Sequence, residues 1–173
     1  MIYRSNRVDS ASYEPLLEVI SIRHVTGNTA GLKPSQKRLL ERTYQRRVAP
    51  DRIISPELAR HLTAISREIG RQVGVLVNRR GQIEDVFVGD AHRIYLPDIG
   101  RARGGQSNLR GLRHIHTVFG RDGLHRDDFA DLTKLRLDLV VALEATDNGQ
   151  PGKMATAHIN PNAHKAKRTI DHV

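Results

Sequence analysis

The sequence contains no cysteine and no tryptophan, and aromatic residues make up only 4% of its 173 residues. The absence of cysteine excludes a disulfide framework and every zinc site built on thiolates. No stretch approaches the roughly 20 apolar residues that a membrane-spanning helix requires. The first residues also lack the apolar run of a secretory signal peptide. We therefore expect a cytoplasmic protein that makes no membrane contact.

Acidic residues are scarce relative to basic ones, since 28 Lys and Arg stand against 19 Asp and Glu and give a net charge of +9. Such an excess favours contact with polyanions such as RNA or a nucleotide phosphate. The candidates for phosphate contact are Arg38, Arg42, Arg46, Arg101 and Arg103. The first three lie on the polar face of a helix predicted over 36–48, and the others lie in a glycine-rich loop over 98–111. A solvated helix face and a simple connecting loop are the structural alternatives.

Hydrophobic periodicity and turn residues predict both helices and strands along the chain. A helix capped by Ser35 is predicted over 36–48, and another begins at Ser55, with Pro56 in its first position, and ends at Gly70. Strands are predicted over 73–77, 83–88, 93–96, 112–119, 137–145 and 153–159, and a further helix over 126–136. This order predicts an α/β fold, with α+β as the alternative, in which helices pack on the faces of one mixed sheet.

Three regions follow from this reading. Residues 1–33 form a partly irregular N-terminal segment, residues 34–160 form a single α/β domain, and residues 161–173 form a basic, polar tail or a linker to a following domain. No internal repeat is present.

One stretch combines residues that ligate metals. His114 and His116 lie one residue apart on the strand predicted over 112–119, so their side chains point to the same face of the sheet. Asp127 and Asp128 open the helix that follows, from which a carboxylate can reach that face. The structural alternative is a pair of histidines bonded in or near the core, with acidic residues that are stabilised by the helix dipole.

Several phrases of the chain together cover most of its length. They are GNTAGLKPSQKRLLERTYQRRV (27–48), ISPELARHLTAISREIGRQVGVLVNRRGQIEDVFVGD (54–90), RIYLPDIGR (93–101), LRGLRHIHT (109–117) and DLTKLRLDLVVALEA (131–145). These phrases resemble the N-terminal extension of long-form HflX-type GTPases. The resemblance implies a non-catalytic accessory module of a larger protein that binds GTP and Mg²⁺ and associates with the large ribosomal subunit or RNA. Because this chain has no P-loop motif, no residue here is assigned to GTP hydrolysis.

The order of elements around the histidines is similar to the JAB/MPN metallopeptidase fold. That resemblance implies a zinc ion held by an HxH pair and an Asp, a Ser between them, and an upstream Glu as general base. Three protein ligands leave one zinc position open for a water molecule, whose pKa falls to about 7. Glu68 is the one upstream residue available as the base.

The motif is incomplete in either register. With His114 and His116 as the pair, Asp127 has the expected separation, but Leu124 occupies the Ser position. With His116 and position 118 as the pair, Asp128 fits, but Val118 cannot bind a metal. The second register agrees better with the HflX-like phrases. We therefore expect a degenerate remnant without zinc, other cofactors or catalytic residues of its own, and keep a metal-dependent hydrolase or isopeptidase as the alternative.

Overall fold

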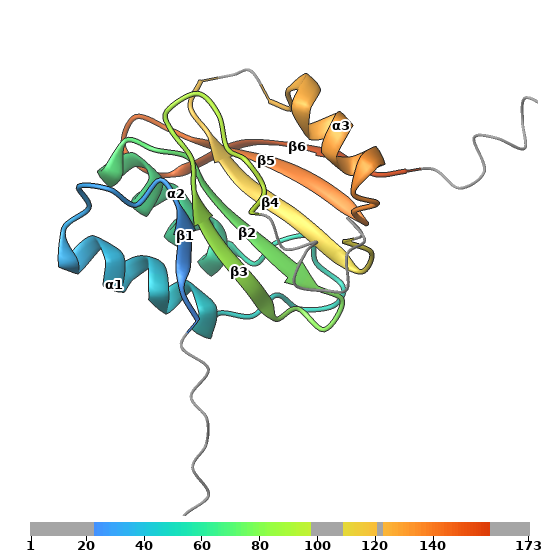
Figure 1. Ribbon diagram of the computed structural model, residues 1–173, viewed down its shortest axis with the longest axis horizontal. Helices are drawn as coiled ribbons and strands as arrows, with labels where there is room; N and C mark the ends of the chain where they lie inside the picture. The colour runs from blue at the N-terminus through green and yellow to red at the C-terminus, as the bar shows by residue number, and fades with distance from the viewer. Residues whose placement is uncertain (1–22, 98–108, 121–122, 160–173) are drawn as a thin grey trace, which may run out of the picture.

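A mixed six-stranded sheet forms the centre of the computed structural model, which describes residues 23–97, 109–120 and 123–159 (Figure 1). The strands are β1 (Val25–Gly27), β2 (Val73–Asn78), β3 (Ile83–Val88), β4 (Leu112–Val118), β5 (Leu139–Ala145) and β6 (Pro151–Ala157). They lie in the order β1-β3-β2-β4-β5-β6. The pairs β1–β3 and β4–β5 are parallel, and the other neighbours are antiparallel. The predicted α/β class with one mixed sheet is confirmed.

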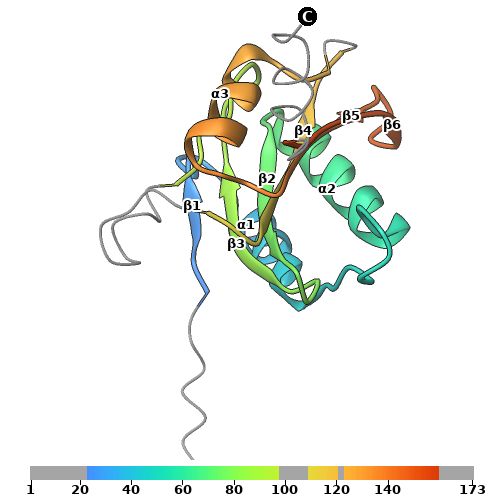
Figure 2. The ribbon, with the colours of Figure 1, turned by 90° about the vertical axis from the view of Figure 1, so that its right-hand side faces the viewer.

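Helices cover both faces of this sheet. They are α1 (Pro34–Arg42), the 3-10 turn η1 (Thr43–Gln45), α2 (Pro56–Ile69) and α3 (Arg126–Lys134). Figure 2 shows α3 on one side of the sheet and α1 with α2 on the other. None of the helices in the described ranges is long and apolar enough to cross a membrane.

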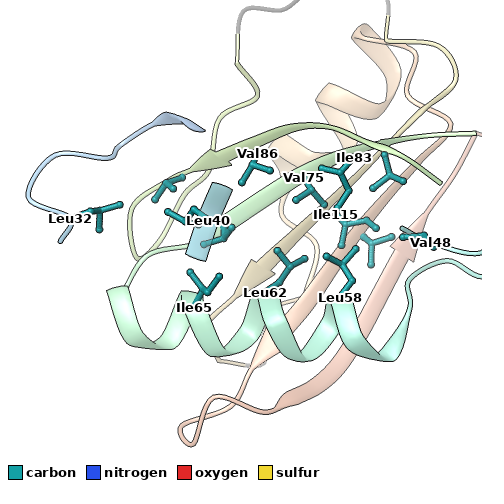
Figure 3. Close-up of a cluster of buried hydrophobic side chains, with 14 residues drawn as sticks. Leu32, Leu40, Val48, Leu58, Leu62, Ile65, Val75, Ile83, Val86 and Ile115 are labelled. Atoms are coloured by element: carbon teal, nitrogen blue, oxygen red, sulfur yellow. The ribbon is translucent and has the colours of Figure 1, made fainter. Parts of the chain in front are cut away.

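Helix α2 forms where its sequence predicts. Ser55 accepts a hydrogen bond from the backbone N–H of Leu58 at 3.2 Å, Pro56 takes the first helical position, and the helix ends at Gly70 with φ of 66°. A left-handed residue at this point favours glycine, because other side chains clash with the backbone there. The apolar face of α2, with Leu58 and Leu62, packs on the sheet (Figure 3).

Two predictions from the sequence differ from the structure: the start of the first helix and the strand over 93–96. The first helix begins at Pro34 rather than after Ser35, because proline suits the first helical position, and it tightens into η1 after Arg42. The strand predicted over 93–96 does not form. The Asp90 carboxylate accepts backbone hydrogen bonds from His92 and Arg93, both at 2.7 Å, and this side-chain turn replaces extended pairing.

The N-terminal segment contributes to the sheet, because β1 pairs with β3 and Leu32 lies in the core. Of the glycine-rich loop predicted over 98–111, residues 98–108, with Arg101 and Arg103, lie outside the described residues, and so does the tail over 161–173.

His61 on α2 makes folding stability depend on pH. Its Nε2 lies 2.8 Å from the Thr43 hydroxyl, and burial together with the nearby Arg46 lowers its pKa from 6.5 to about 4. In the unfolded chain His61 takes up its proton near pH 6.5, so the free energy of unfolding falls as pH drops from about 6.5 to about 4. Because solvent reaches part of the ring, we expect a contribution on the order of 1 kcal/mol.

Urea unfolding of the wild type and His61→Gln at pH 7.5, 6, 5 and 4 measures this dependence. The variant should lose about 1 kcal/mol less than the wild type across the range, since glutamine takes up no proton. Parallel curves for the two proteins would contradict the assignment.

Candidate metal centre

Strand β4 delivers two histidines to the α3 face of the sheet. Its residues alternate in direction, so Leu112 packs with the cluster beside α3, and Ile115 packs with the cluster beside α2. His114 and His116 share the face of Leu112 and are 1% and 2% exposed. The pattern of the sequence therefore predicted their common direction correctly.

Small residues flank His116 within the sheet. Gly74 of β2 and Ala142 of β5 are its partners across the two strand pairings, whereas His114 lies between Leu76 and Val140. Large side chains at positions 74 and 142 would project from the same face, because directly paired residues point the same way. The space above Gly74 is filled by the side chains of Phe87 and Ile94, which a Cβ at position 74 would meet at 2.6 and 2.8 Å.

Asp128 approaches the histidines from the first turn of α3. Its Oδ2 accepts a hydrogen bond from the backbone N–H of His125 at 2.8 Å, which fixes the carboxylate at the start of the helix. Its Oδ1 lies 2.8 Å from His116 Nε2. Burial opposes ionisation of Asp128, but His116 and the His125 backbone N–H hold its pKa below 3.8. Asp128 is therefore a buried carboxylate, 7% exposed.

His114 is buried without polar partners. Its ring lies 5.4 Å from the Phe87 ring and 4.8 Å from the His116 ring, measured between centroids. Neither ring nitrogen has a hydrogen-bond partner among the described residues. Leaving a buried polar group unpaired costs about 1–3 kcal/mol. Burial, and secondarily the neighbouring His116, hold the pKa of His114 well below 6.5, so the ring is neutral, the form that binds metals.

His116 has one nitrogen near the backbone and one facing Asp128. Nδ1 lies 3.3 Å from the Thr117 carbonyl oxygen, and a proton on Nδ1 would leave a lone pair on Nε2 for a metal. The contact between Nε2 and Asp128 Oδ1 is short but lacks the alignment of a hydrogen bond. The two atoms can share a proton, or they can bind one cation together.

The three residues fit a divalent transition metal. One ligand atom from each of His114, His116 and Asp128 lies within 4.8 Å of the others. Two imidazole nitrogens and one carboxylate oxygen form a common zinc donor set, with bonds of about 2.0–2.2 Å. Tetrahedral bonds of that length place donor atoms about 3.4 Å apart. This separation lies between the 2.8 Å from His116 Nε2 to Asp128 Oδ1 and the 4.8 Å within which the three ligand atoms lie.

A cleft of about 450 Å³ opens beside the cluster. It is lined by Gln72, His92, Arg93, Ile94, His116, His125, Arg126, Asp127 and Asp128. A metal ion on His116 and Asp128 would therefore border open space, where a water molecule or a ligand could complete its coordination.

The structure joins parts of both sequence registers. It brings together His114 and His116 with Asp128, whereas Asp127 is exposed and lines the cleft. Val118 is buried outside the cluster, and no ligand is needed from it. The structure therefore does not place the candidate ligands at positions 116 and 118, the register that the sequence favoured. The expectation that no metal binds stays a prediction.

Glu68 lies far from the cluster in the architecture. It is on α2, at the opposite face of the sheet, where its Oε1 lies 3.4 Å from the Gln36 amide of α1. Sequence reasoning also missed Gln72, which is 3% exposed and lines the cleft. In the sequence, only its position directly before β2 could have pointed to Gln72. That position does not tell which face of the sheet its side chain borders.

The arginines of the first helix also lie away from the cluster. Arg38 and Arg42 are exposed on α1, and Arg46 is half-buried beyond η1. They share the face of the sheet that α2 covers, so the metal cluster and these arginines are separated by the sheet (Figure 2).

The fold and the cluster define an α/β domain with a buried His–His–Asp set beneath an open cleft. No protein-family model, curated protein or solved structure matches the chain.

Replacement of His114 by leucine tests whether the unpaired imidazole lowers the stability of the metal-free protein. Because leucine has similar bulk and no polar atom, His114→Leu should leave the free energy of unfolding of metal-free protein unchanged or raise it by about 1–2 kcal/mol. Ile115→Ala, at the neighbouring position on the other face, should lower it by about 2–5 kcal/mol. Denaturant unfolding in the presence of a chelator gives both values, and a loss above about 2 kcal/mol for His114→Leu would show that the ring has partners.

Proposed function

We propose that this domain binds one divalent transition-metal ion, with zinc as the best match, through His114, His116 and Asp128. The observation that carries the proposal is the neutral, buried His114, whose two ring nitrogens lack partners among the described residues while two other metal-ligating groups lie beside it. A bound cation would use the lone pairs of the histidines together with the charge of the Asp128 carboxylate. It would act as a Lewis acid toward a ligand in the cleft.

The surroundings favour binding rather than hydrolysis. A metal-dependent hydrolase needs a group that accepts a proton from the attacking water. Glu68, the predicted base, lies on α2 at the other face of the sheet, and Gln72, which borders the cleft beside the metal ligands, is an amide that cannot act as a base. His92 and His125 also line the cleft, and both are exposed. Asp127 is the other carboxylate of the cleft and is exposed. The hydrolase alternative is therefore the weaker proposal.

Metal content and thermal stability test this function. Purified protein, dialysed without chelator, should hold one equivalent of zinc, and saturating zinc at 100 times Kd should add about 2.7 kcal/mol to the free energy of unfolding. His116→Ala and Asp128→Asn should lose both effects. His24→Ala, a change at an exposed histidine near β1, is the matched control and should keep them.

Less than a tenth of an equivalent of zinc in the wild type, or equal zinc binding by His24→Ala and His116→Ala, would rule the proposal out.

A second role has its own observation. The outer face of α1 is basic, because Lys37, Arg38 and Arg42 are exposed and have no ion-pair partner among the described residues. Such a surface supports the HflX-like hypothesis, in which the domain is an accessory module that contacts RNA or the large ribosomal subunit for a parent GTPase. Because the metal centre lies on the α3 face of the sheet, it would not take part in that contact.

Two charge reversals separate a specific basic face from the general positive charge. Arg42→Glu on α1 and Arg80→Glu at the β2–β3 turn change the net charge equally, and both residues are exposed. In co-sedimentation with large ribosomal subunits across salt concentrations, Arg42→Glu should weaken binding and reduce the slope of log K against log salt by about 1. Equal effects of both variants, or no effect of either at low salt, would contradict this role.

A further inference from the structure

We propose that the cleft beside the metal centre binds a phosphate group, which coordinates the metal and pairs with Arg93, Arg126 and the amide of Gln72. This inference rests on the proposed metal function and names the class of ligand that the site takes.

The cleft lies where a ligand would meet the metal. Two of the three metal ligands, His116 and Asp128, line the same space of about 450 Å³ as the segment after β3 and the first turn of α3. The space exceeds what a phosphate group alone fills, so an organic group attached to the phosphate also fits.

The cleft becomes positively charged when a metal binds. Its charged side chains are Arg93, Arg126, Asp127 and Asp128, which cancel. A divalent ion therefore leaves two net positive charges beside open space, and His92 and His125 add hydrogen-bonding groups without adding a negative charge. A phosphate monoester carries about −1.5 to −2 at pH 7 and matches this charge.

The arginines suit phosphate geometrically. Guanidinium groups donate two parallel N–H groups to the oxygens of a phosphate. Arg93 and Arg126 are exposed, and they approach the cleft from different segments, the turn after β3 and the start of α3. Arg93 donates a hydrogen bond to the Tyr95 hydroxyl at 3.5 Å and lies near Asp127, so these two groups compete with an anion for its guanidinium. The N-terminal turn of α3 adds the favourable end of a helix dipole.

Gln72 supplies an independent indication. Gln72 is 3% exposed and lines the cleft. Its backbone is fixed by hydrogen bonds to Asp90 and from Gly89, which hold the residue at the start of β2. A side-chain amide held beside an open space is suited to bind a polar ligand group.

Calorimetry with inorganic phosphate tests the inference on protein that carries one equivalent of zinc, with bound zinc quantified in every sample. We expect the double variant Arg93→Ala/Arg126→Ala to bind phosphate at least about 10-fold more weakly than the wild type while keeping its zinc. Gln72→Leu should show a loss of about 10-fold, also with zinc retained. Arg80→Ala, outside the cleft, is the control and should bind as the wild type does.

The dependence on metal separates the two proposals. Removal of zinc should weaken phosphate binding at least about 10-fold, because the cleft then loses its net positive charge. Phosphate that binds zinc-loaded and zinc-free protein equally, or a double variant that binds as tightly as wild type, overturns this inference while the metal function stands. Protein that takes up no zinc is a failure of the proposed function, read from the metal content alone.

The class of ligand is checked by competition. Acetate should displace phosphate at least about 10-fold less well than phosphate itself, because a monoanion matches less of the charge. Equal competition by acetate would overturn the phosphate assignment. A nucleoside 5′-monophosphate, tested beside its unphosphorylated nucleoside, separates the two sources of the anion: tighter binding than phosphate assigns an organophosphate, and equal binding assigns free phosphate.

Discussion

The position of β4 between β2 and β5 is the constraint on which the site depends. A central strand is paired on both edges, so its backbone cannot shift without loss of two hydrogen-bond ladders. The register with β2 and β5 fixes His116 opposite Gly74 and Ala142 and places His114 one step earlier on the same face. A slip by one residue would turn both histidines toward α2 and replace them by Ile115 and Thr117.

The helices then give the two faces of the sheet different characters. On the α2 face, Thr117 joins Ser66 through a hydroxyl contact of 2.7 Å beside the apolar cluster. On the α3 face, a shorter helix covers less of the sheet, and its acidic first turn meets the histidines. A buried, neutral His114 without polar partners among the described residues lowers stability, and the proposed metal would offset that cost. The cleft opens beside the first turn of this short helix α3.

The sequence allowed the fold to be predicted further than the site. Alternation along 112–118 and the cap and stop signals of α2 reflect local chemistry, so the direction of the histidines and the ends of that helix were predicted correctly. The strand predicted over 93–96 failed because one side chain, Asp90, took the backbone donors that pairing would have used. The choice between Asp127 and Asp128 depends on the rotation of α3 about its axis, and Gln72 enters the cleft through the tertiary arrangement. The spacing of residues along the chain predicts neither the rotation of α3 nor the position of Gln72.

X-ray absorption at the zinc edge of zinc-loaded protein tests the central claim most directly. The account predicts two imidazole nitrogens and light oxygen ligands at about 2.0–2.2 Å, with one imidazole contribution lost in His114→Ala. A spectrum without imidazole scattering, or one unchanged in His114→Ala, would contradict it.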